Sequence, residues 1–236
     1  MEPLVSVSDF SKSYGSVHAV RGLSFDVHPG ELFGLIGPDG AGKTTTMRTL
    51  VTLLRPDAGT LTVHGRNVVT EMKAIRSITG YMPQRFSLYP DLSVEQNLRF
   101  FADLFAVPTD ELPVRIERLY RFSRLQPFAK RLAGRLSGGM KQKLALSCTL
   151  IHNPVLLVLD EPTTGVDPVS RTEFWEILRE LREEGVTIVV STPYMDEALH
   201  CDRIAILHNG RALAMGTPAE LIRGMQYPMY ALHDDE

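Results

Sequence analysis

Residues 32–44, which read LFGLIGPDGAGKT, decide how the rest of the chain is interpreted. The first five are apolar almost throughout, which predicts a short strand buried on both faces, as in the centre of a parallel sheet. The last eight fit the phosphate-binding pattern of a glycine, four residues and then Gly-Lys-Thr. Residues 44–54 suit the helix that follows such a loop. The alternative, a glycine-rich turn with a chance lysine, is disfavoured by these flanks.

The chemistry of the loop follows from its residue types. Glycines allow successive N–H groups to approach phosphate oxygens without a Cβ clash, and the following helix adds the positive end of its dipole. Lys43 would bring a positive charge to the β- and γ-phosphates of a nucleotide, and the Thr44 hydroxyl would ligate Mg²⁺. The predicted nucleotide-binding residues of the loop are Gly37, Pro38, Asp39, Gly40, Ala41, Gly42, Lys43, Thr44 and Thr45.

A second apolar run ends in two acids. Residues 155–159 read VLLVL, and Asp160 and Glu161 follow at the strand end, where open α/β sheets bind ligands. Asp160 is predicted to orient Mg²⁺ through water. Successive strand side chains point in opposite directions, so Glu161 would point differently and act as a general base on an attacking water. An acidic turn without a catalytic role is the alternative.

Alternation of strands and helices predicts an α/β fold with a parallel sheet. A third apolar run, residues 186–190, adds a strand, and an apolar stripe after Asp167 predicts a helix capped by that residue. The stripe consists of Phe174, Ile177, Leu178 and Leu181. Ser93 and Thr217 each begin a further helix with a capping box, the first running to about Ala106.

Two parts of the chain depart from this alternation. Residues 86–153 predict helix after helix without a strand, so we expect a helical subdomain inserted into the sheet domain. Residues 4–10 and 17–27 alternate more strongly and predict a separate antiparallel patch together with residues 59–65.

The composition excludes several classes of protein. The chain has 236 residues, of which 44% are hydrophobic and 22% charged, as in ordinary globular domains rather than disordered or fibrous ones. The net charge, 25 − 28 = −3, is far from that of a dedicated nucleic-acid binder. No apolar run approaches the roughly 18 residues of a membrane span, and the N-terminus lacks the pattern of a signal peptide. Two cysteines, Cys148 and Cys201, fit a reducing cytosol.

A third motif makes a family resemblance visible. Residues 136–142, LSGGMKQ, resemble the LSGGQ signature of ABC ATPases and precede the strand of Asp160 at the spacing typical of that family. The resemblance covers about residues 4–224. It implies a P-loop NTPase of the ABC ATPase type over residues 1–224, with a parallel-sheet core, a small antiparallel β subdomain and the helical subdomain at about 86–153. Residues 225–236 would be a C-terminal tail.

The resemblance also assigns residues to roles. Ser137, Gly138 and Gly139 would hold the γ-phosphate of ATP bound to an opposite subunit in a head-to-tail dimer. Tyr14 resembles the aromatic residue that stacks on adenine, although an ordinary tyrosine is the alternative. Gln84 would touch Mg²⁺ and the attacking water, unless it is a solvated loop residue.

Asp167 resembles the aspartate that crosses the dimer interface, and it can cap its helix as well. The implied cofactors are ATP and Mg²⁺. The implied catalytic residues are Glu161, Gln84 and Lys43, and the implied metal-binding residues are Thr44, Gln84 and Asp160.

Two residues depart from the family pattern. Pro193 stands where the family usually has a histidine that contacts the γ-phosphate, and proline offers neither an imidazole nor an N–H. We therefore predict slow hydrolysis at this site despite Glu161, unless Thr192 and Pro193 merely start the next helix. Asp39 stands where the family has asparagine and adds a negative charge near the phosphates, which can raise a carboxylate pKa.

The finer pattern resembles multidrug ABC-2-type exporters, particularly the first half of their tandem-ATPase members. It implies an ATPase subunit at the inner face of the cell membrane, held there by a separate membrane-spanning permease and paired with a second ATPase domain. A groove near residues 84–106 would take a short helix of the permease. The alternatives are a regulatory ATP-binding module with little hydrolysis and a soluble ABC protein on ribosomes or nucleic acid. No nucleic-acid partner is expected.

The middle of the chain is basic. Residues 115–143 carry nine Lys or Arg and one acid, and Arg115, Arg118, Arg121 and Arg124 recur every three residues. A solvated helix face, an anionic membrane surface and nucleic acid each fit such a stripe.

Overall fold

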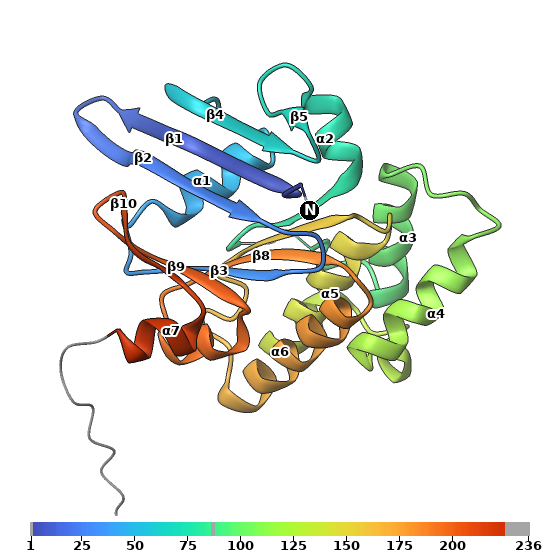
Figure 1. The fold of residues 1–236 in the computed structure, drawn as a ribbon. Helices are drawn as coiled ribbons and strands as arrows, with labels where there is room; N and C mark the ends of the chain where they lie inside the picture. The colour runs from blue at the N-terminus through green and yellow to red at the C-terminus, as the bar shows by residue number, and fades with distance from the viewer. Residues whose placement is uncertain (1, 86–87, 225–236) are drawn as a thin grey trace, which may run out of the picture.

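Two β-sheets form the frame of the protein in a computed structural model, which describes residues 2–85 and 88–224 (Figure 1). The larger sheet has the strand order β10-β9-β3-β8-β7-β6. Its strands are β3 (Leu32–Ile36), β6 (Thr79–Met82), β7 (Leu156–Asp160), β8 (Thr187–Thr192), β9 (Arg203–His208) and β10 (Arg211–Gly216). All neighbouring pairs are parallel except β9 with β10. The predicted parallel core is confirmed; compared with the runs 155–159 and 186–190, β7 and β8 each begin one residue later and end one and two residues later.

The three strands β6, β9 and β10 were not expected from apolar runs. Each lies in an outer part of the sheet, where burial is incomplete, so its hydrophobic pattern is weaker. In β6, Gly80 lies against the helix formed by Gly138–Leu150, and a Cβ on Gly80 would be 2.9 Å from the Thr149 carbonyl oxygen of that helix.

The smaller sheet is antiparallel, as predicted, with the order β2-β1-β4-β5. Its strands are β1 (Val5–Tyr14), β2 (Val17–Val27), β4 (Ala58–Val63) and β5 (Arg66–Asn67). Its inner face shares one hydrophobic cluster with helix α1 (Lys43–Leu50) and with one face of β3, β7 and β8. Phe25 and Phe33 stack across this junction with ring centroids 5.1 Å apart. The helix after the P-loop is shorter than the predicted 44–54, since it ends at Leu50.

The opposite face of the larger sheet packs on helices. Helices α5 (Gly138–Leu150) and α6 (Pro168–Glu183) pack directly on this face, α7 (Pro218–Arg223) lies against β10, and α3 (Val94–Leu104) and α4 (Leu112–Ser123) pack on α5. Helix α2 (Met72–Ile78) lies on the other side, where its buried Ile75 joins the cluster of the smaller sheet. The predicted α6 stripe of Phe174, Ile177, Leu178 and Leu181 is buried, and the Asp167 carboxylate caps the helix by accepting from Ser170 N at 2.9 Å. Both predicted capping boxes are present, Ser93 with Gln96 and Thr217 with Glu220.

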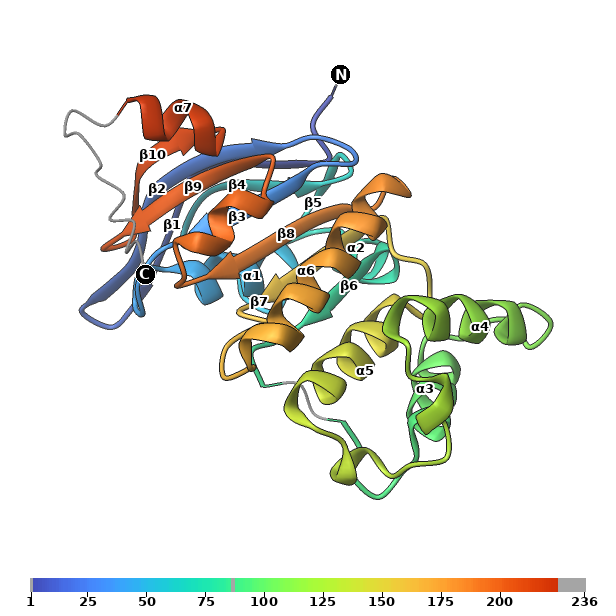
Figure 2. The same cartoon turned by 90° about the horizontal axis from the view of Figure 1, so that it is seen from below.

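The middle of the chain is helical. Between residues 88 and 153 the structure has α3, α4, α5 and the short 3-10 turns Gln126–Phe128 and Ala133–Arg135, with a single isolated β-bridge and no strand. Figure 2 shows α3, α4 and α5 side by side beyond the β6 edge of the sheet. Residues 86–87 and the predicted tail, 225–236, lie outside the described residues. The boundaries 1–224 and 86–153 remain predictions.

The basic stripe on α4 is partly engaged in holding helices together. Arg115 donates to the Ile151 carbonyl oxygen at 2.9 Å and pairs with Glu111. Arg118 donates to Asn153 Oδ1 at 3.0 Å and pairs with Glu184 at the end of α6. These two arginines therefore tie α4 to α5 and α6 instead of presenting a free charged surface.

Two further features concern the apolarity of the helices and the state of the two cysteines. Across residues 2–85 and 88–224, no helix combines the length and apolarity that crossing a membrane requires. Cys148 and Cys201 are buried free thiols, and burial raises the pKa of each above its ordinary value.

Candidate active site

A cavity of about 580 Å³ opens at the carboxyl ends of β3 and β7. Its walls come from the predicted phosphate loop (residues 39–45), from the β1–β2 hairpin, and from Gln84 and Glu161. This is the edge where parallel α/β sheets bind their ligands, because helix N-termini and strand ends meet there.

The loop owes its shape to two close approaches of the backbone. A Cβ on Gly37 would lie 2.2 Å from the Leu207 carbonyl oxygen, and one on Gly42 would lie 2.6 Å from that of Ala19. Gly42 also has a φ of +101°, which L side chains rarely adopt, and it sits at the cap of α1. No other residue type fits these two positions, because the backbones of β9 and β2 lie against them.

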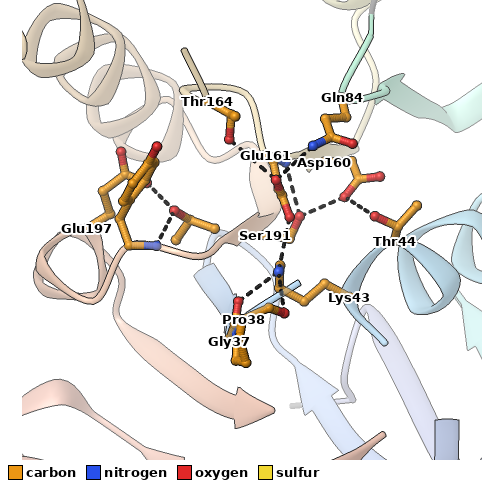
Figure 3. A network of polar contacts seen from close by, with 12 residues as sticks. Gly37, Pro38, Lys43, Thr44, Gln84, Asp160, Glu161, Thr164, Ser191 and Glu197 are labelled. Carbon is orange, nitrogen blue, oxygen red and sulfur yellow. Dashed lines mark hydrogen bonds and ion pairs between the residues drawn. The ribbon is translucent and has the colours of Figure 1, made fainter. Parts of the chain in front are cut away.

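Lys43 lies at the centre of the site. Its Nζ donates to the carbonyl oxygens of Gly37 at 2.7 Å and Pro38 at 3.0 Å, and lies 3.0 Å from Glu161 Oε1 (Figure 3). The side chains of Lys43 and Glu161 are only 3% and 6% exposed. Gln84 Nε2 donates to the other Glu161 oxygen, Oε2, at 3.0 Å. The three predicted catalytic residues therefore meet in one network.

Asp160 forms a second, adjoining centre. It is buried, and its Oδ1 accepts from Thr44 Oγ1 at 3.0 Å and from Ser191 Oγ at 2.8 Å. Its Oδ2 is also buried and has no hydrogen-bond partner. Burial raises the pKa of Asp160, and the hydrogen bonds from Ser191 and Thr44 oppose that rise.

The donor set around Oδ2 fits Mg²⁺. A carboxylate oxygen without a partner and a neighbouring threonine hydroxyl are hard oxygen ligands, the kind that Mg²⁺ prefers. Among the described residues, no group of three or more His, Cys, Asp or Glu could hold a metal by itself. Such a site would therefore depend on phosphate oxygens and water for its remaining ligands.

The signature residues lie apart from this cavity. Ser137 caps α5 by accepting from Met140 N at 3.3 Å, and Gly138 and Gly139 form the first turn. None of the three is among the described residues that line the cavity of Lys43. Gly139 is also required by packing, since a Cβ there would lie 2.2 Å from Ser170 Oγ on α6.

Tyr14, Asp39 and Asp167 are surface residues. Tyr14 ends β1, is 46% exposed, and lies beside the hairpin residues 16–19 that do line the cavity. Asp39 lines the cavity and is exposed. Asp167 is exposed as well, and the hydrogen bond from the Ser170 backbone N–H holds its pKa below the ordinary value.

Pro193 lies in the turn directly after β8. The Thr192 carbonyl oxygen accepts from Gly37 N at 3.2 Å, so this turn adjoins the first residue of the phosphate loop. The interpretation that Thr192 and Pro193 start a helix is wrong, since Thr192 ends β8 and the next helical turn is Asp196–His200. Instead, the buried Glu197 carboxylate holds the turn by accepting from Thr192 Oγ1 and, at 2.8 Å, from Thr163 Oγ1.

Sequence reasoning missed several residues of the site. His18, Arg21 and Asn209 line the cavity, and Ser191 bonds Asp160, yet none belongs to a recognisable motif. They reach the site through strand pairing and hairpin geometry, for which the sequence carries no local signal.

The geometry defines a P-loop nucleotide-binding domain with an inserted helical segment. Residues 20–164 match the family described as ABC transporter. The chain is 48% identical over 207 residues to the probable multidrug ABC transporter ATP-binding protein YbhF of Escherichia coli K12. It is 43% identical over 221 residues to Nod factor export ATP-binding protein I of Ralstonia nicotianae, covering 93% of this chain and 69% of that protein.

Solved structures agree with this assignment. An ATP-binding subunit of an ABC transporter is 32% identical with a TM-score of 0.82, covering 93% of this chain and 92% of its own. A bacterial ABC transporter cassette solved as a dimer is 25% identical with a TM-score of 0.81, covering 90% of this chain and 98% of its own. The chain belongs to the ABC transporter family, as an ATP-binding cassette. The match with the Escherichia coli protein spans 88% of this chain but only 36% of that protein.

Proposed function

We propose that this chain binds Mg²⁺-ATP in the phosphate-loop cavity and hydrolyses it as the ATP-binding subunit of a membrane exporter. The observation that carries the proposal is the single network of Lys43, Glu161 and Gln84, next to the partner-free oxygen of Asp160. The relatives support the same activity, because both named proteins are called ATP-binding proteins.

Binding would use the loop amides and one lysine. The backbone N–H groups of residues 40–45 and the Lys43 ammonium would hold the β- and γ-phosphates. Thr44, Asp160 and Gln84 would hold Mg²⁺, which neutralises phosphate charge when bound. Tyr14, at the edge of the cavity, would stack on the adenine ring.

Hydrolysis would depend on releasing Glu161 from Lys43. The Glu161 carboxylate lies 3.0 Å from the buried Lys43 ammonium and neutralises it. A phosphate oxygen that takes over this contact would free the carboxylate to accept a proton from water. The water oxygen would then bond to the γ-phosphorus as the bond to the β–γ bridging oxygen breaks, so that ADP and inorganic phosphate leave. Gln84, which already donates to Glu161 Oε2, would orient that water.

A second ATPase domain would complete the site. Ser137 and Gly138 are exposed at the N-terminus of α5 outside the cavity, and Gly139 follows them in the first turn; the three would face nucleotide held by a partner cassette. Exposed Asp167 would cross the same interface. A related cassette solved as a dimer supports this arrangement.

The permease would dock on an apolar surface of the helical segment. Tyr89, Phe100, Leu104 and Phe105 are exposed there, and the rings of Tyr89 and Phe100 lie 4.4 Å apart. This surface falls within residues 84–106, and a bound permease would hold the chain at the cytoplasmic face of the membrane. The names of the relatives, multidrug transporter and Nod factor export protein, favour export as the direction.

Purification of the tagged chain from detergent-solubilised membranes tests the exporter assignment. We expect a polytopic membrane protein to copurify with wild type and to be lost in Phe100→Asp. Val114→Asp, which changes an exposed apolar residue on α4 outside this surface, is the matched control and should retain it. Recovery of RNA alone, released by salt, would contradict the exporter role.

A regulatory module with little hydrolysis is the second candidate. Pro193 favours it, because the turn beside Gly37 lacks an imidazole that could reach the γ-phosphate. ATP-dependent dimers that release no phosphate would support this candidate over the first.

A further inference from the structure

Ser191 stands between the two acids of the site without facing the cavity. It lies on β8, is fully buried, and pairs in parallel register with Asp160 on β7. It is not among the described residues that line the cavity of Lys43. Any effect on nucleotide must therefore pass through the residues that Ser191 touches.

The direction of each hydrogen bond at Ser191 follows from its chemistry. A serine hydroxyl carries one proton and can accept other bonds. Since an ionised carboxylate only accepts, the Ser191 proton goes to Asp160 Oδ1 at 2.8 Å. The Ser191 oxygen then accepts from the Glu161 backbone N–H at 3.0 Å. One hydroxyl thus links the backbone of Glu161 to the carboxylate of Asp160 (Figure 3).

The backbone at Glu161 needs this support. Its φ is +49°, in the left-handed region, where the Cβ of a residue with a side chain crowds the following carbonyl oxygen. The Glu161 N–H is directed at Ser191 twice, at the hydroxyl and at the backbone carbonyl oxygen 3.1 Å away. Backbone conformations of this kind persist where the surroundings hold them.

The same hydroxyl selects which oxygen of Asp160 stays free. Ser191 and Thr44 both donate to Oδ1, whereas the buried Oδ2 receives no bond. We propose that Ser191 is a positioning residue, which turns Asp160 Oδ2 toward Mg²⁺ and fixes the backbone of Glu161. The inference rests on the proposed metal-binding role of Asp160.

Metal-dependent nucleotide binding tests the proposal. A fluorescent ATP analogue is titrated onto the full chain in EDTA and again over a range of Mg²⁺ concentrations. For Ser191→Ala we expect the half-saturating Mg²⁺ concentration to rise by about tenfold or more, the usual effect of removing a group that orients a metal ligand. Binding in EDTA should stay as in wild type. Ser191→Thr, which keeps the hydroxyl, should restore most of the Mg²⁺ dependence.

Ser147→Ala is the matched control, because Ser147 is a buried serine on α5 whose hydroxyl donates to the Lys143 carbonyl oxygen at 2.8 Å. It should leave the Mg²⁺ dependence unchanged. If Ser191→Ala does not fold, Ser191→Cys, with its weaker S–H donor, takes its place. If Ser191→Ala, or Ser191→Cys in its place, responds to Mg²⁺ like Ser147→Ala, the positioning role is overturned. A wild type whose nucleotide binding ignores Mg²⁺ overturns the proposed metal site itself.

Discussion

Replacing Glu161 by glutamine should separate ATP binding from ATP hydrolysis. The substitution keeps the shape of the side chain and removes its charge. Loss of a positioned general base typically slows a reaction by about 10²–10⁴-fold, so we expect steady-state phosphate release to fall by that factor. ATP affinity should be retained or increased, because Lys43 no longer has to leave a carboxylate to meet a phosphate.

The same substitution should lower the stability of the nucleotide-free protein. At 3.0 Å, the charges of Lys43 and Glu161 attract by about 5 kcal/mol at an effective dielectric constant of about 20. Removing the carboxylate also removes its desolvation cost of several kcal/mol, and the ammonium keeps the carbonyl oxygens of Gly37 and Pro38. We therefore expect a net loss of about 2 kcal/mol, which lowers Tm by about 4–8 °C in a chain of this size.

Phosphate release, nucleotide titration and thermal unfolding are measured on the same preparation. Glu31→Gln is the matched control, since Glu31 is a buried acid paired with Arg203 at 3.1 Å, remote from the phosphate loop. It should lower Tm and leave kcat unchanged. Undiminished hydrolysis by Glu161→Gln would refute the assignment of the general base.

Three further predictions concern other parts of the chain. Pro193→His should raise kcat by about tenfold or more by supplying a hydrogen-bond donor to the γ-phosphate. A wild type that already hydrolyses ATP rapidly, with no increase in Pro193→His, would contradict this prediction. Gly139→Ala should destabilise the protein by about 1–3 kcal/mol in denaturant unfolding, because its Cβ would meet Ser170 Oγ at 2.2 Å. Ser170→Gly should restore most of that loss, and additive effects would argue against the clash. Burial lowers the pKa of His152, and the nearby charge of Arg115 lowers it further. The unfolded chain therefore binds the proton more readily than the folded chain. The stability that neutral His152 contributes is present above about pH 6.5 and is lost as the pH falls below that value. His152→Phe should flatten this part of the unfolding profile, and an unchanged slope would exclude His152 as its source.

The features predicted correctly from the sequence are those with a local cause. The run 32–36 is apolar because β3 is buried on both faces, and Gly42 has a φ of +101° that favours glycine. Capping by Ser93 and Asp167 likewise depends on atoms three residues away. Such features leave a signal in a short window of sequence.

The features that were missed depend on which strands become neighbours. Ser191 reaches Asp160 only because β8 lies between β3 and β7, an order set by the whole sheet. Glu197 holds the turn after β8 by bonding Thr163, which is 34 residues away. Neither contact has a spacing that a sequence pattern could reveal.

Equilibrium binding of ATP in the presence of Mg²⁺, compared between wild type and Lys43→Ala, tests the central claim most directly. The claim predicts saturable binding by wild type and at least about tenfold weaker binding by the variant, which loses a charge-assisted contact and leaves Glu161 unpaired beside the phosphates. Lys73→Ala, which removes an exposed lysine on α2, should bind as wild type does. Equal affinity of Lys43→Ala and wild type would contradict the account of this cavity as the nucleotide site.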